Sequence, residues 1–130
     1  MNTLFLVSMI IEGIFAAGFI AVPGTMLGQF GVTLDVTATV FARLFGSALL
    51  GFPVILWYAR RSDKTEFKNG VARGLFIYYL ASTPILLLTQ TAGLMNAKGW
   101  SIVVLHFVFL GWFGIYVFKK NGPSKLGQRR

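Results

Sequence analysis

The sequence predicts an all-α fold: a polytopic membrane protein built as a bundle of four transmembrane helices. Hydrophobic residues make up 55% of the 130 residues, charged residues make up 12%, and the mean hydropathy is +0.70. A soluble domain carries about 25% charged residues, roughly twice this share. The apolar residues fall into four blocks of about 20 residues, each long enough to cross a bilayer. These observations exclude a soluble globular domain, a large catalytic module outside the membrane and a large nucleotide-binding fold.

The transmembrane domain is predicted over residues 1–120, and the apolar blocks define its four spans. Pro23 ends the first block, and Thr33 or Asp35 is a suitable N-cap for the second. The stretch 62–70 is the only clearly polar internal segment, so we expect it to be a solvent loop. The predicted spans cover residues 3–22, 36–59, 71–91 and 100–118.

Small residues and two prolines mark where these helices are expected to pack and bend. In lipid, helices associate through close backbone approach and not through the hydrophobic effect. Pro53 and Pro84 each lack an amide donor, which predicts a kink in the second span and another in the third. Helix contacts are predicted at the small residues of three spans, namely Gly13, Ala17, Ala21, Ala42, Gly46, Ser47, Gly51, Gly111 and Gly114.

The distribution of Lys and Arg predicts the orientation in the membrane. The connection between the first and second spans has no Lys or Arg, and the connection between the third and fourth spans has only Lys98. The middle loop, the start of the third span and the C-terminal end hold ten of the twelve, namely Arg60, Arg61, Lys64, Lys68, Arg73, Lys119, Lys120, Lys125, Arg129 and Arg130. Positive residues collect on the cytoplasmic side, so the middle loop and a basic tail of residues 121–130 are predicted to be cytoplasmic. Four spans then bring the N-terminus to the same side. We expect a multi-pass protein of the cytoplasmic (inner) membrane with its N- and C-termini cytoplasmic.

Three ionisable residues lie within the predicted spans: Glu12, Arg43 and His106. At 1.5 Å per residue, Glu12 lies roughly 14 Å from the inner edge, while Arg43 and His106 lie roughly 10 Å from the outer edge. An arginine side chain is long enough to bridge the remaining offset. We therefore expect one polar cluster in the outer half of the membrane, in which Glu12 and Arg43 form an ion pair. Tyr78 of the third span is expected to add a hydroxyl group to this cluster.

The cluster has a structural and a functional interpretation. As structure, the ion pair of Glu12 with Arg43 fixes how the first two spans pair, and removing one partner is strongly destabilising. As function, charged residues inside a membrane mark a site that binds or moves something. His106 titrates near neutral pH, which fits a proton-coupled role. The aromatic residues that follow His106 in its span resemble those of a quinone or pigment site, although aromatic packing against lipid explains them better.

Other chemistries and partners are constrained by composition. The absence of cysteine excludes disulfides, thiolate catalysis and iron–sulfur clusters, and one histidine with four carboxylates disfavours a metal site. The sequence identifies no cofactor. The net charge of +8 is concentrated on the predicted cytoplasmic rim. Its expected partners are therefore anionic lipid headgroups and not nucleic acid. A membrane-protein partner and a second copy of the chain both remain open.

Part of the first half of the chain resembles a known family. Glu12 in the first span, Pro23 at its end and the segment FARLFGSALLGFPVILWYAR at residues 41–60 resemble small DoxX-like four-helix membrane proteins of bacteria. The resemblance covers about the first 60 residues and implies a fold more than a function. Glu12 is also similarly placed to a glutamate of the small multidrug transporters. The long basic middle loop departs from that second family, as does Arg43, which would neutralise the glutamate.

These observations predict a non-enzymatic membrane accessory or scaffold protein. It would hold an apolar ligand, such as a lipid, a quinone or a pigment, near Glu12, Arg43 and His106. The alternative is a small proton-coupled transporter that uses Glu12 as the carrier of a proton or cation. A third interpretation is a membrane enzyme acting on lipid or isoprenoid substrates, with His106 and Glu12 as acid–base groups.

Overall fold

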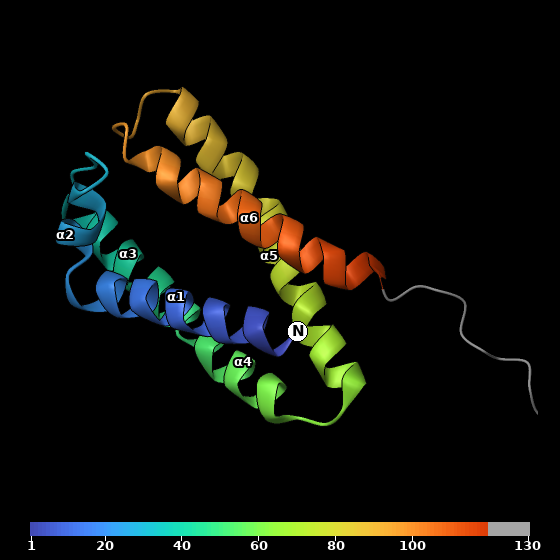
Figure 1. Cartoon of the computed structure of the whole chain (residues 1–130). Coiled ribbons are helices and arrows are strands. Elements are labelled where there is room, and N and C mark those ends of the chain that lie inside the picture. Colours follow the sequence, from blue (N-terminus) through green and yellow to red (C-terminus); the bar gives the residue numbers. More distant parts are fainter. Residues whose placement is uncertain (120–130) are drawn as a thin grey trace, which may run out of the picture.

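A computed structural model describes residues 1–119, and this part of the chain is helical apart from short connections (Figure 1). The helices are α1 (Asn2–Ala21), α2 (Pro23–Gly28), α3 (Val36–Leu49), α4 (Gly51–Arg61), α5 (Thr65–Thr91) and α6 (Gly99–Lys119). Four segments are long and apolar enough to cross a membrane: Asn2–Ala21, Val36–Arg61, Thr65–Thr91 and Gly99–Lys119. The predicted all-α architecture with four candidate spans is therefore confirmed. The predicted tail, residues 121–130, lies outside the described residues.

One local prediction about the connections is wrong, and one connection contains an additional short helix. α5 begins at Thr65, so most of the stretch expected to be a solvent loop is helical. A polar segment without proline can stay helical when its side chains face water. Glu66 in the first turn also interacts favourably with the positive end of the helix dipole. The connection after the first span contains the short helix α2, which Pro23 begins. Proline is favoured at this position because its missing amide would have no partner there.

The two intramembrane prolines act differently. Pro53 lies in the first turn of α4, directly after a break at Leu50 that separates α3 from α4. Leu50 keeps helical backbone angles and its backbone amide donates to the carbonyl oxygen of Gly46 at 3.0 Å, so the interruption is local; the predicted kink stays a prediction. Pro84 lies inside α5, which stays helical from Thr65 to Thr91.

The helices form two layers, which lie close together near the N-terminus of α1 and farther apart toward α2 (Figure 1). α1 packs along α3 and α4 in one layer, and α5 packs along α6 in the other. The core joins both layers through Leu4, Phe5, Leu56, Ala59, Ala72, Leu75, Tyr79, Phe109 and Phe113. Many large apolar side chains are exposed instead, among them Ile14, Phe41, Ile77, Ile85, Leu88 and Ile115. An apolar outer surface of this extent is typical of helices that face lipid.

Gly46 sets the closest approach between α1 and α3. A Cβ atom at Gly46 would lie 2.7 Å from the Cβ of Phe19 and 3.0 Å from the carbonyl oxygen of Ala16. The predicted small-residue contact is therefore confirmed at Gly46. The same prediction is wrong for Gly51 and Gly111, where a Cβ atom would meet nothing within 4 Å.

The two layers are also joined at the end of the bundle that carries the connections 28–35 and 92–98, here called the Asn96 end. The side-chain nitrogen of Asn96 donates a hydrogen bond to the carbonyl oxygen of Gln29 at 3.0 Å. The backbone amide of Asn96 donates to the carbonyl oxygen of Phe30 at 2.7 Å. Gly31 has a φ of +80°, and a Cβ atom there would approach Asn96 to 3.3 Å, so this close approach depends on glycine.

Candidate functional site

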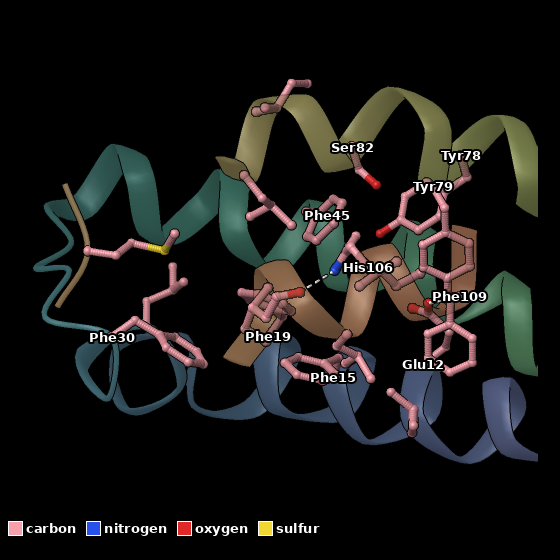
Figure 2. A pocket seen from close by; sticks show the side chains of 18 residues that line it. Glu12, Phe15, Phe19, Phe30, Phe45, Tyr78, Tyr79, Ser82, His106 and Phe109 are labelled. Atoms are coloured by element: carbon pink, nitrogen blue, oxygen red, sulfur yellow. Dashed lines mark hydrogen bonds between the residues drawn. The ribbon is translucent and has the colours of Figure 1, made fainter. Parts of the chain in front are cut away.

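A cavity of about 300 Å³ lies between the two layers, in the half of the bundle nearer the Asn96 end. α1, α3, α5 and α6 all contribute side chains to its wall (Figure 2). Its aromatic lining is formed by Phe15, Phe19, Phe30, Phe45 and Phe109, and its polar lining by Glu12, Tyr78, Tyr79, Ser82 and His106. Figure 2 shows Glu12, Tyr78 and Tyr79 toward one side of the cavity and Phe30 at the opposite end. The wall of the cavity is therefore almost entirely apolar, with a few polar groups gathered away from Phe30 (Figure 2).

Glu12 lies on the face of α1 that points into the protein. The buried positions Leu4, Ser8, Glu12 and Ala16 recur every four residues, so they share one helix face. Only 6% of Glu12 is exposed, and its Oε1 atom accepts a hydrogen bond from the hydroxyl of Tyr79. The sequence-based expectation of a glutamate inside the bundle agrees with this position, although its partner was not foreseen.

Tyr79 is the functional candidate that the sequence reasoning missed. Its side chain is 1% exposed and stacks on Phe109 and Phe113 of α6, at ring-centroid distances of 5.2 Å and 5.7 Å. This stacking fixes the ring and directs its hydroxyl at Glu12. The available signal was helical periodicity, because Ala72, Leu75, Tyr79 and Thr83 form the buried face of α5.

Tyr78, which was predicted as a site residue, also lines the cavity. It packs edge-to-face on Phe52 of α4 at 4.9 Å between ring centroids. It also contacts Tyr79 at 5.0 Å and lies 6.3 Å from the ring of His106. The structure therefore brings Tyr78 and His106 to the same cavity as Glu12, as expected.

His106 is half-buried on α6, and its ring meets that of Tyr79 edge-to-face at 5.4 Å. Its Nδ1 atom lies 3.0 Å from the carbonyl oxygen of Ile102, one turn earlier in the helix (Figure 2). A carbonyl oxygen can only accept, so Nδ1 carries the proton of this bond. In the neutral ring, Nε2 is then a hydrogen-bond acceptor.

The structure does not bring Arg43 to this cluster. Arg43 is exposed, and no ion pair with Glu12 is formed within residues 1–119. The reason is angular: α3 turns Ala42, Gly46 and Leu49 inward, and Arg43 lies about 100° around the helix from Ala42. The predicted ion pair between Glu12 and Arg43 is therefore wrong, because the prediction used only depth along the helix axis and not direction around it.

Ser82 is a further polar group of the cavity wall. Its Oγ atom is buried and has no hydrogen-bond partner among the described residues. Figure 2 shows the hydroxyl directed into the cavity, on the same side as Tyr79. A buried hydroxyl without a hydrogen-bond partner is destabilising. A bound molecule that forms a hydrogen bond with the Ser82 hydroxyl would remove this cost.

Comparison of the chain with protein-family models, with curated proteins and with solved structures finds no match. The resemblance to DoxX-like proteins therefore stays a prediction. Within residues 1–119, no three His, Cys, Asp or Glu side chains come together in a way that could hold a metal ion.

Proposed function

We propose that this chain is a non-enzymatic membrane accessory protein that holds an apolar ligand in the cavity between its two helix layers. The observation that carries this proposal is the apolar cavity with a few polar groups in its wall. Ligand sites are mostly apolar concavities with a few polar groups that orient the ligand. Here the wall is largely aromatic and aliphatic, and Glu12, Ser82 and His106 supply the orienting groups. A lipid, a quinone or a pigment would bind through its apolar part.

The proposed location is the cytoplasmic membrane, with both termini on the cytoplasmic side. The arrangement of basic residues supports this orientation. Arg60, Arg61, Lys64 and Lys68 lie in the α4–α5 connection or beside it, whereas Lys98 lies at the Asn96 end. Basic residues at one end favour that end as the cytoplasmic one and favour anionic headgroups as its partners. In this orientation the cavity lies in the outer half of the membrane.

The first test of this function fills the cavity. Ser82→Leu puts a larger apolar side chain into it, and Ala81→Leu makes the same size of change at the exposed neighbouring position. Each protein would be purified in nanodiscs formed directly from cell membranes, and its bound small molecules identified by mass spectrometry. We expect a species that accompanies the wild type and Ala81→Leu and is depleted in Ser82→Leu. The same species in equal amount in all three proteins would contradict the proposal.

A second candidate is a small proton-coupled transporter, and one observation favours it. Arg43 does not neutralise Glu12, so the main sequence argument against a carrier role for this carboxylate no longer applies. The transporter proposal predicts proton uptake or release on addition of a cationic substrate, absent in Glu12→Gln and present in His106→Gln. The accessory-protein proposal predicts no such signal in proteoliposomes.

A further inference from the structure

The hydrogen-bonding groups at the polar side of the cavity are unevenly divided between donors and acceptors. The hydroxyl proton of Tyr79 is committed to Glu12, and the Nδ1 proton of His106 is committed to the carbonyl oxygen of Ile102. The groups left for a ligand are the second carboxylate oxygen of Glu12 and Nε2 of the neutral His106 ring, both acceptors. The hydroxyls of Ser82 and Tyr78 serve as either donor or acceptor.

The polar side of the cavity also holds a negative charge without a positive one. Glu12 is the only carboxylate in the wall, and no Lys or Arg among the described residues lines the cavity. A carboxylate in an apolar interior is costly unless a partner offsets its charge or a proton neutralises it. Tyr79 supplies a hydrogen bond and no positive charge.

The size of the cavity limits the apolar part of the ligand. About 300 Å³ lies at the lower end of the range of ~300–1,000 Å³ for ligand sites. A two-chain lipid or a long polyisoprenoid exceeds this space and would extend out through the open side of the cavity. The wall continues from the polar side through Phe19 and Phe45 toward Phe30, so the space suits a single chain lying along the bundle (Figure 2).

We infer that the cavity takes a single-chain alkyl amine, whose N–H groups donate to Glu12 and to Nε2 of His106 while its chain lies among the phenylalanines. This inference rests on the proposed ligand-binding function and narrows it to one head-group chemistry. Quinones and fatty acids fit less well. A quinone carbonyl offers only acceptors to an acceptor-rich site, and a fatty-acid carboxylate adds a second negative charge beside Glu12.

The test compares probes with one chain and different head groups. The full chain in phosphatidylcholine nanodiscs would be titrated with radiolabelled dodecylamine, with binding to empty nanodiscs subtracted. Unlabelled dodecanoate and dodecyltrimethylammonium would then compete; the second keeps the charge and lacks N–H donors. We expect dodecylamine to bind saturably. Dodecanoate and dodecyltrimethylammonium should each compete with an affinity at least about tenfold lower, because a charge-assisted hydrogen bond contributes about 1.5–3 kcal/mol. Equal competition by either would overturn the inference.

Variants give a second, independent measurement. Glu12→Gln should weaken dodecylamine binding at least about tenfold, while Glu66→Gln, the same change at an exposed position of α5, should leave it unaltered. If Glu12→Gln does not fold, His106→Phe removes the other acceptor and should weaken binding of the primary amine more than that of the quaternary one. Saturable binding of dodecanoate that Ser82→Leu abolishes would overturn the amine and leave the ligand-binding function standing. If none of these probes binds saturably, the amine inference is overturned. A native small molecule that is depleted in Ser82→Leu would still support the ligand-binding function.

Discussion

The hydroxyl of Tyr79 on α5 donates a hydrogen bond to the carboxylate of Glu12 on α1, across 67 residues of sequence. The bond lies between the two helix layers, beside the cavity. It is the principal polar link between the layers inside the bundle, and Asn96 supplies the corresponding link at one end. The partner of the buried carboxylate is thus a phenol held by α6 aromatics, and not the guanidinium that the sequence suggested.

The first prediction concerns this pair. Glu12→Leu, which removes both acceptor oxygens, and Tyr79→Phe, which removes the donor, should each lower the free energy of unfolding in detergent by about 1.5–3 kcal/mol, the range for hydrogen bonds to charged groups. The double variant should lose much less than the sum, because both changes remove one shared bond. Tyr79→Phe keeps the stacking on Phe109 and Phe113, so its effect reports the hydroxyl.

The matched control for that cycle is Arg43. Because Arg43 is exposed and does not meet Glu12, the effects of Arg43→Gln and Glu12→Leu should add within about 0.5 kcal/mol. A larger coupling would restore the ion pair expected from sequence. Both measurements use the same thermal or denaturant unfolding transition.

The second prediction concerns the α1–α3 contact. Gly46→Ala should destabilise the protein by about 1–3 kcal/mol, because the new methyl group overlaps Phe19 and the backbone of α1. Gly111→Ala is the control, since a Cβ atom there meets nothing within 4 Å. That change should leave stability equal or raise it by up to about 1 kcal/mol. Equal changes in the two variants would contradict a specific role for the close contact at Gly46.

The third prediction concerns the Asn96 end. Asn96→Ala removes the side-chain bonds to Gln29 and from the amide of Lys98. Amide hydrogen exchange of residues 28–32 should become faster, corresponding to a loss of about 0.5–1.5 kcal/mol in local stability per bond. Lys98→Ala is the control, because Lys98 contributes only its backbone amide to these bonds and both are kept. The amides of residues 28–32 in this variant should exchange at the wild-type rate. Unchanged exchange in Asn96→Ala would show that the backbone bond to Phe30 suffices.

The fourth prediction is the orientation. The chain has no cysteine, so single cysteines can be introduced at exposed Thr65 and Gln29 without a background. An impermeant thiol reagent applied to intact cells should label Gln29→Cys and not Thr65→Cys, because the basic loop is expected inside. Both should react after permeabilisation. The reverse pattern in intact cells would invert the topology and put the cavity in the inner half of the membrane.

The four spans could be predicted because bilayer thickness and residue polarity determine them almost alone. Glu12 and His106 could be identified as interior groups for the same reason, since a charge or imidazole in lipid is costly. Depth along a helix follows directly from residue count, and the axial estimates brought Glu12 and His106 to one cavity. The cavity itself could not be predicted, because it depends on how far the two layers separate.

The errors at Arg43 and Tyr79 share one physical cause. A shift of one residue rotates a side chain by about 100°, so depth says nothing about direction. Tyr79 lies next to Tyr78, and only the buried stripe of α5 selects it as the partner of Glu12. The start of α5 was missed because polarity marks the membrane boundary and does not end a helix.

The pairing of helices within layers has a consequence for biosynthesis. α1 packs mainly on α3 and α4, and α5 mainly on α6, so each layer joins segments that leave the ribosome one after the other. Chains fold from the N-terminus as they are made, and the first layer can dock while α5 is still unsynthesised. Glu12 is then synthesised before Tyr79 and is at first without its hydrogen-bond partner. The cavity has side chains of both layers in its wall, so it is formed only when the second hairpin arrives, which makes its formation a late step of assembly.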